Sequence, residues 1–218
     1  MRVGVLGTGM VGEAIATRLC ELGHEVMLGS RSATNEKALA WAQHHAPHAS
    51  VGTFAEAAAY GSFAFHCTHG ETAEDVLRSA AAELAGKLVI DTSNPLDFSG
   101  DAPGLFVAIT DSLAERLQRA VPEARIVKAL NTITASVMVH PDAVPGDHVT
   151  FIAGDDDAAK AEASAVLQQF GWPAASIIDV GDLKGARATE AYLPLWLKLM
   201  GHVGHAQFNI SVAAAPQG

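Results

Sequence analysis

The chain has 218 residues, of which 49% are hydrophobic and 17% are charged. This composition excludes a disordered protein and predicts a compact fold. The length leaves room for one domain and a small appendage. Its formal net charge of −10 makes nucleic acids and anionic membrane surfaces unfavourable partners. Because there are only two cysteines and no signal-peptide pattern at the start, we expect a cytoplasmic protein without a disulfide framework.

Short apolar runs alternate along the chain with stretches whose apolar residues recur three and four positions apart. The runs predict strands at 2–7, 24–30, 62–68, 87–92, 125–131, 148–154 and 175–180. The stretches predict helices at 10–22, 34–45, 71–85, 112–120 and 156–170, with a short one at 55–59. This alternation predicts an α/β fold with a doubly wound, mostly parallel sheet, whose ligands bind at the carboxyl ends of the strands.

Beyond residue 181 the pattern changes, so we divide the chain into a doubly wound domain over 1–181 and a C-terminal helix and tail over 182–218. The helix is expected at 185–200, with a kink caused by Pro194. Its broad apolar stripe consists of Leu193, Trp196, Leu197 and Met200. We therefore predict a homodimer in which this helix lies at or beside the interface and helps to wall a binding pocket.

A glycine-rich turn, GTGMVG, follows the first predicted strand and opens the first predicted helix. The first glycine permits a tight turn, the second leaves space for a pyrophosphate, and the third lets the helix pack close to the strand. The helix N-terminus adds free amides and the positive end of its dipole. We therefore predict a dinucleotide site. Its residues are Gly7, Thr8, Gly9, Met10, Val11 and Gly12.

The end of the second predicted strand distinguishes NADP from NAD, because an acid there binds the 2′-hydroxyl of NAD and a basic residue binds the 2′-phosphate of NADP. The chain has Ser30, Arg31 and Ser32 at this place, with Lys37 further on and no acid at the strand tip. Hydroxyls and a guanidinium suit a dianionic phosphate. The sequence therefore favours NADP over NAD. It also indicates that the domain over 1–181 binds this NADP. The alternative is that Arg31 is an ordinary solvated side chain.

With these residues in hand, the chain resembles the NADP oxidoreductases that depend on coenzyme F-420, a deazaflavin, and their bacterial relatives. The resemblance covers nearly the whole chain and is carried by MRVGVLGTGMVGEAIATRLCELGHEVMLGSRS, KLVIDTSNPL, ARIVKALNTITA, FIAGDDDAAK and VGDLKGARATEAYLPLWLKLM. The nucleotide domain also resembles the cytoplasmic reductase module of metalloreductases, which pass electrons from NADPH through a flavin to iron or copper. Both resemblances imply a Rossmann fold that binds NADP.

The first resemblance also implies roles for individual residues. It assigns the pyrophosphate to Thr8, Gly9, Met10 and Val11. It assigns the 2′-phosphate to Ser30, Arg31 and Lys37. It lines the nicotinamide half with Thr68, Thr72, Asn94, Leu96 and Ala135. Archaeal members commonly carry a GGTG turn, a proline after the fourth strand and a histidine in the segment that reads KALNT here, whereas this chain has Gly7-Thr8-Gly9, His69 and Asn131. These departures lie on the deazaflavin side and leave the second substrate open.

The predicted binding edge carries few groups for acid–base chemistry. Hydride transfer between nicotinamide and a deazaflavin or flavin ring requires no protein acid or base. Reduction of a carbonyl would require a proton donor, for which His69 is the candidate, although a lone histidine at a strand tip is more often a loop residue. The amides of Asn94 and Asn131 could orient the nicotinamide carboxamide or a substrate, or simply form turns. The long loop at 93–110 is expected to be functional.

Three other features are interpreted as structural. The histidines at 44–48 lie at a helix end without ligands at suitable spacing, so no metal site is predicted. Cys67 is expected to be a buried filler, not a nucleophile. Arg187 and Glu190, three positions apart, are expected to pair on a helix surface.

The leading hypothesis is an NADPH-dependent reductase of a deazaflavin or flavin-like acceptor. A reductase of a small carbonyl, an imine or a ferric substrate is the enzymatic alternative. A non-enzymatic NADPH-binding redox sensor is the alternative of another class, because it would equally lack an acid–base group.

Overall fold

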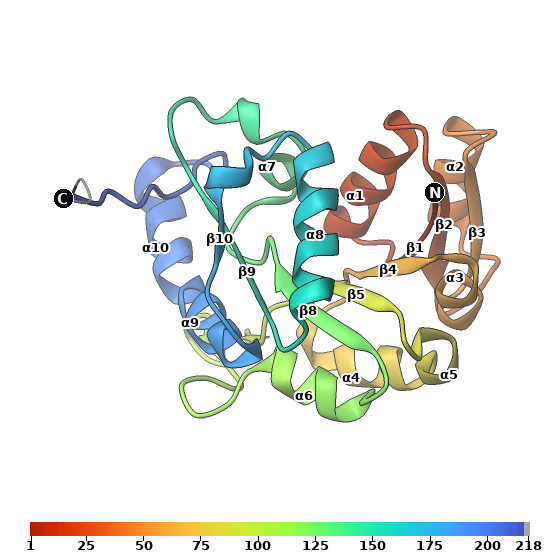
Figure 1. Ribbon diagram of the computed structural model, residues 1–218, viewed down its shortest axis with the longest axis horizontal. Coiled ribbons are helices and arrows are strands. Elements are labelled where there is room, and N and C mark those ends of the chain that lie inside the picture. The colour runs from red at the N-terminus through yellow and green to blue at the C-terminus, as the bar shows by residue number, and fades with distance from the viewer. Residues whose placement is uncertain (216–218) are drawn as a thin grey trace.

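The computed structural model describes residues 1–215 and contains an eight-stranded sheet with helices on both faces (Figure 1). The strands are Arg2–Leu6 (β1), Glu25–Ser30 (β2), Ala49–Thr53 (β3), Phe63–His66 (β4), Leu88–Asp91 (β5), Leu96–Asp97 (β6), Gly104–Leu105 (β7), Arg125–Ala129 (β8), Thr150–Gly154 (β9) and Ile177–Asp179 (β10). The helices are Met10–Glu21 (α1), Glu36–His44 (α2), Phe54–Tyr60 (α3), Gly70–Arg78 (α4), Ala81–Leu84 (α5), Leu113–Ala120 (α6), Ala135–Val139 (α7), Asp157–Gln169 (α8), Ala186–Ala191 (α9) and Leu193–Val203 (α10).

The main sheet has the order β10-β9-β8-β5-β4-β1-β2-β3, and β6 and β7 form a separate two-stranded ribbon. The six strands from β8 to β3 in this order are parallel, whereas β9 pairs with β8 in the antiparallel direction and β10 follows β9. The predicted α/β fold with a mostly parallel sheet is confirmed. The carboxyl ends of β1, β2, β4, β5 and β8 therefore meet at one edge, where a doubly wound sheet binds its ligand.

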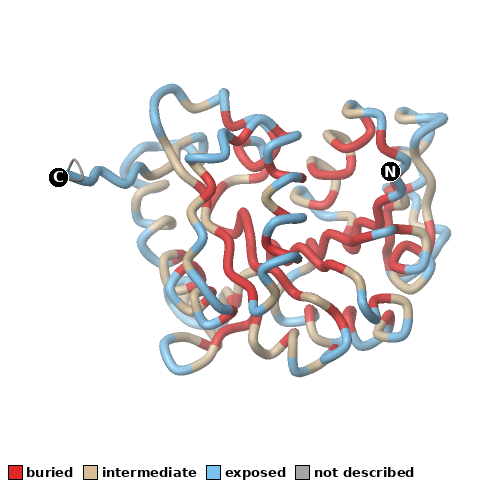
Figure 2. Tube along the Cα trace, viewed as in Figure 1, coloured by how far each residue is buried: buried red, intermediate tan, exposed pale blue. Residues whose placement is uncertain are grey.

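The strands lie between two apolar layers. In Figure 2 the central strands are coloured mainly as buried. One layer includes Ile15 of α1 and Phe65 of β4, whose ring stacks on Phe170 with the ring centroids 5.9 Å apart. The other layer includes Leu77 of α4 and Leu117 of α6. Burial on both faces explains why the parallel strands read as continuous apolar runs. No helix within residues 1–215 is long and apolar enough to cross a membrane.

The structure differs from the sequence prediction in several places, and β6, β7 and α7 were among the elements not predicted. Strand β3 was not predicted, because ASVGT is a half-buried edge strand of small residues without a clear period. The helix expected at 71–85 is divided into α4 and α5 where the Ser79 hydroxyl donates to the Val76 carbonyl oxygen at 2.7 Å. The helix expected at 185–200 is likewise two helices, α9 and α10, which meet at Tyr192. Pro194 lacks the N–H that would continue the hydrogen-bond ladder there.

Candidate functional site

The turn between β1 and α1 is shaped by its glycines. Gly7 has φ +127°, and a side chain on it would begin 2.5 Å from the Cys67 carbonyl oxygen. A Cβ on Gly12 would collide with the Gly7 carbonyl oxygen, so the first turn of α1 packs directly on the loop. A Cβ on Gly9, by contrast, would meet nothing within 4 Å. The space in front of the α1 N-terminus is therefore open, and these residues fit the pyrophosphate of a dinucleotide.

The segment after β2 presents a free guanidinium beside a well-ordered turn. The buried Ser30 hydroxyl donates to the Ser32 carbonyl oxygen at 2.6 Å and accepts from the Ser32 amide at 3.2 Å, so Ser30 holds the turn. Arg31 is exposed, and within residues 1–215 it makes no ion pair. Lys37 lies with its Nζ 2.8 Å from Glu13 Oε2 on α1. Arg31 is thus the cation with its charge available to an added anion.

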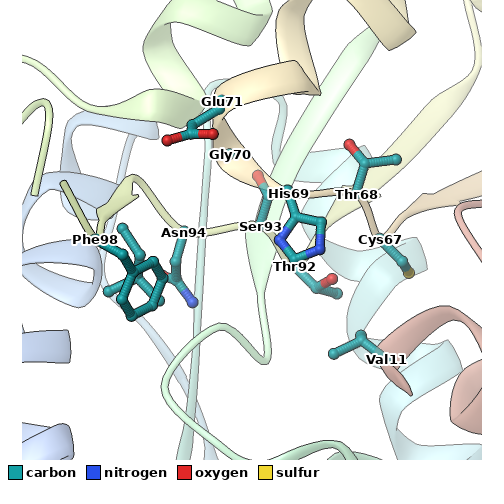
Figure 3. A pocket seen from close by; sticks show the side chains of 11 residues that line it. Val11, Cys67, Thr68, His69, Gly70, Glu71, Thr92, Ser93, Asn94 and Phe98 are labelled. Atoms are coloured by element: carbon teal, nitrogen blue, oxygen red, sulfur yellow. The ribbon is translucent and has the colours of Figure 1, made fainter. Parts of the chain in front are cut away.

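A pocket of about 240 Å³ continues from the α1 N-terminus along the carboxyl ends of β4 and β5 (Figure 3). It is lined by Val11, Cys67, Thr68, His69, Gly70, Glu71, Thr92, Ser93, Asn94, Leu96 and Phe98. Five predicted site residues are therefore brought together: Val11, Thr68, His69, Asn94 and Leu96. The lining does not include Thr72, Asn131 or Ala135. Cys67 and the exposed Phe98 line it without having been predicted.

The two asparagines that follow β5 and β8 bind each other. Asn94 Nδ2 donates to the Asn131 carbonyl oxygen at 2.8 Å, and Asn131 Nδ2 donates to Asn94 Oδ1 at 2.9 Å. The turn before Asn131 requires the buried Leu130 to adopt φ +61°, a conformation that non-glycine residues rarely take. This pair joins two loops at the floor of the site, and only the partly exposed Asn94 also faces the pocket.

A buried chain of ionisable groups runs beneath the pocket across three strands to α9. His66 Nδ1 on β4 lies 2.8 Å from Asp91 Oδ1 on β5, and Asp91 Oδ2 lies 2.6 Å from Lys128 Nζ on β8. Lys128 Nζ then lies 2.9 Å from Glu190 Oε1. All four side chains are at most 1% exposed. At the other end, His66 Nε2 lies 2.6 Å from the Thr68 hydroxyl on the pocket wall.

Each ion of this chain lies beside an opposite charge. Burial alone would raise the pKa of Asp91, but Lys128 and His66 hold it well below its usual range. Burial alone would lower the pKa of Lys128, but Asp91 and Glu190 raise it. Glu190 Oε2 also accepts from the amide of Leu113, the first residue of α6, at 2.7 Å.

The expected surface pair between Arg187 and Glu190 is wrong. Arg187 binds Glu115 of α6 through two nitrogens, at 2.8 and 2.6 Å, while Glu190 turns inward to Lys128. The spacing alone could not distinguish these arrangements, because both faces of α9 carry charge. Cys67 is buried as expected, and burial raises the pKa of its thiol to about 12, so it is no nucleophile.

Comparison with known proteins identifies the family of this chain. The profile of the NADP oxidoreductases, coenzyme F420-dependent, matches residues 2–95. The F420-dependent NADP reductase of Methanothermobacter marburgensis is 32% identical over 209 residues, which cover 91% of this chain and 92% of that protein. The chain belongs to this family. It is therefore an NADP-dependent oxidoreductase, and the family uses NADP and coenzyme F420 as substrates.

Two further relatives show how far this likeness extends. A solved structure from Arthrobacter sp. FB24, assigned provisionally as an F420-dependent NADP reductase, is 42% identical, with a TM-score of 0.91 and coverage of 97% of this chain and 99% of that one. Metalloreductase STEAP3 of Rattus norvegicus is 31% identical over 201 residues. The chain spans only 38% of that protein, so the likeness covers one part of the metalloreductase.

Proposed function

We propose that the chain transfers a hydride between NADP(H) and either a deazaflavin, such as coenzyme F420, or a flavin-like ring. The observation that carries the proposal is the continuity of the open glycine turn with the pocket. Val11 belongs to the first turn of α1 and also lines the pocket. A dinucleotide with its pyrophosphate at Gly9 would therefore direct its nicotinamide end into the pocket, along Thr68, Asn94 and Leu96. The names of the reductases from Methanothermobacter and Arthrobacter support the same acceptor.

In this proposal the nucleotide is held mostly by backbone and by one cation. The amides of Thr8, Gly9, Met10 and Val11 bind the pyrophosphate at the positive end of α1. Arg31 binds the 2′-phosphate, with Ser32 and Lys37 beside it and Ser30 fixing the turn. Lys37 contributes less than Arg31, because Glu13 already neutralises it at 2.8 Å.

The nicotinamide and the acceptor ring supply the redox chemistry when both are bound. The chain holds them in contact and excludes water, with Thr68 and His69 on one side of the pocket and Leu96 and Phe98 on the other. The exposed His69 at the pocket wall is the observation that favours the second candidate, reduction of a small carbonyl or imine, because such a substrate needs a proton donor.

We also propose that two copies assemble through the C-terminal part, 182–218, of which residues 216–218 lie outside the described residues. Only Leu193 of α10 is buried, whereas Leu195 is 56% exposed and Val203 is 42% exposed. Trp196 stacks on Phe208 of its own chain, with ring centroids 5.4 Å apart. Leu195 and Val203 are therefore the apolar side chains that a second copy would cover, and α10 would then help to wall the acceptor side of the NADP-binding domain, 1–181.

The test is NADPH oxidation under anaerobic conditions with coenzyme F420, FMN, a ferric chelate, an aldehyde and a cyclic imine, each measured separately. We expect the deazaflavin to be reduced fastest and NADPH to be preferred to NADH. Gly9→Val is the folded control that should be inactive. Fast reduction of only the imine or the ferric chelate would contradict the proposed acceptor, and tight NADPH binding without reduction of any acceptor would favour the redox sensor.

A further inference from the structure

Thr68, His66 and Asp91 form a hydrogen-bonded series that begins at the pocket and ends in the core. The Thr68 hydroxyl lies 2.6 Å from His66 Nε2, and His66 Nδ1 lies 2.8 Å from Asp91 Oδ1. Thr68 is half-buried and lines the pocket, whereas His66 and Asp91 are fully buried. Both distances are within the range in which a hydroxyl, an imidazole and a carboxylate exchange protons.

The partners of Asp91 fix the direction of these hydrogen bonds. Asp91 is an ionised carboxylate beside Lys128, and its Oδ1 also accepts from the Ser93 amide at 3.1 Å and from the Ser93 hydroxyl at 2.7 Å. Because a carboxylate only accepts, His66 Nδ1 carries a proton and donates it to Asp91. In the neutral imidazole Nε2 is then the acceptor, so the Thr68 hydroxyl donates to it. The lone pairs of Thr68 Oγ1 are thereby left free for the pocket.

The surrounding charges leave room for one more proton on His66. The buried ions that are linked to it through Asp91 are two carboxylates, Asp91 and Glu190, and one ammonium, Lys128. A proton on His66 would balance the two anions with two cations. On the pocket side, His69 and Glu71 are exposed and solvated. The buried network can therefore receive a proton at His66 without creating an unbalanced charge in the core.

We propose that Thr68 and His66 carry the proton that accompanies hydride transfer, an inference that rests on the proposed function. A reduced donor ring that gives a hydride to NADP⁺ also loses one proton. Thr68 Oγ1 accepts this proton as its own hydroxyl proton passes to His66 Nε2, and Asp91 stabilises the resulting imidazolium. The proton leaves by the same path in reverse once the oxidised ring has departed. Thr68 is the catalytic residue, and His66 is the positioning residue behind it.

Two substitutions of Thr68 test the relay without touching the buried charges. Thr68→Val keeps the shape and removes the hydroxyl, whereas Thr68→Ser restores a hydroxyl. Hydride transfer from the reduced deazaflavin to NADP⁺ is measured in a single turnover in H₂O and in D₂O. We expect Thr68→Val to slow the transfer by about 100-fold or more and to abolish the solvent isotope effect, because positioned acid–base groups contribute about 10²- to 10⁴-fold. Thr68→Ser should keep both the rate and the isotope effect near the wild-type values.

The outcomes separate this inference from the proposed function. If the wild type reduces NADP⁺ with the reduced deazaflavin and Thr68→Val does so equally fast with the same solvent isotope effect, the relay is overturned and the function stands. If the wild type transfers no hydride to a deazaflavin or flavin, the proposed function is wrong and the relay falls with it.

A second readout needs no acceptor at all. In the ¹⁵N spectrum of the histidines of the ligand-free protein, His66 should be protonated at Nδ1 and should accept a hydrogen bond at Nε2. Thr68→Val should shift the His66 Nε2 signal toward that of a free imidazole nitrogen, and Thr68→Ser should not. A bare Nδ1, or a His66 signal unaffected by Thr68→Val, overturns the relay.

Discussion

Replacement of Lys128 by methionine tests whether the buried charges beneath the pocket form one interdependent unit. Methionine has nearly the same length and leaves no cavity, so the change removes the charge and little else. The variant loses the contacts of Lys128 Nζ to Asp91 at 2.6 Å and to Glu190 at 2.9 Å, and its hydrogen bond to the Ser93 carbonyl oxygen at 2.7 Å. Two carboxylates then remain in the core without their shared cation.

The expected loss is about 3–5 kcal/mol of unfolding free energy, which is the usual cost of leaving a buried charge without its partner. Glu190 keeps the amides of Leu113 and Ala114, and Asp91 keeps His66 and Ser93, so the loss should stay in this range. The natural control is Lys37→Met, because Lys37 pairs with Glu13 at 2.8 Å but is 57% exposed. Exposed pairs contribute about 0.2–1 kcal/mol.

Urea unfolding followed by tryptophan fluorescence measures the unfolding free energy of both variants. The pH dependence of this free energy tests whether unpaired carboxylates cause the loss. In the wild type the pKa of Asp91 is lowered, so its stabilisation is present above about pH 4 and is lost as the pH falls further. In Lys128→Met a carboxylate without its cation should have a raised pKa, so the deficit should shrink as the pH falls from 7 to 5. The reasoning is refuted if Lys128→Met costs no more than Lys37→Met, or if its deficit does not change with pH. Adding Glu190→Gln to Lys128→Met should restore part of the stability.

Three further predictions concern the proposed NADP site and assembly. Arg31→Ala should weaken NADPH binding by about 10- to 100-fold and leave NADH binding unchanged, because the lost charge-assisted bonds go only to the 2′-phosphate, and equal losses in a titration would contradict this role. Gly9→Val should abolish binding of both dinucleotides, because its side chain would fill the open space at the α1 N-terminus, and its circular dichroism spectrum should be unchanged. Near-native affinity would show that the pyrophosphate does not bind at Gly9. Leu195→Glu should convert a dimer to monomers in sedimentation equilibrium, whereas a monomeric wild type, or an unchanged dimer in the variant, would remove α10 from an interface.

The glycine turn could be predicted because its signal is local. Three glycines within one strand–helix junction have separate backbone roles. In the structure Gly7 adopts a positive φ, a Cβ on Gly9 would lie in open space, and Gly12 packs directly against the loop. The alternation of apolar runs and helical stretches likewise predicted the sheet, since both faces of its strands are buried. Strand β3 was missed because its small, half-buried residues carry no such signal.

The buried charges could not be assembled from sequence, because their partners come together only when the sheet closes. Lys128 and His66 lie within apolar runs, and Glu190 lies on a helix far along the chain. A usable signal did exist: a charge inside a strand that is buried on both faces must have a buried partner. It indicates that a partner is needed but not which one, and so Glu190 was wrongly paired with Arg187.

The proposed hydride transfer is tested most directly by following the hydrogen itself. The protein is mixed with oxidised coenzyme F420 and NADPH carrying deuterium at the transferable position of nicotinamide C4, and the reduced deazaflavin from a single turnover is analysed by mass spectrometry. Direct transfer inside the pocket predicts that one deuterium is retained on a ring carbon of the deazaflavin. A deazaflavin that stays oxidised, or that is reduced without the label, would contradict the account.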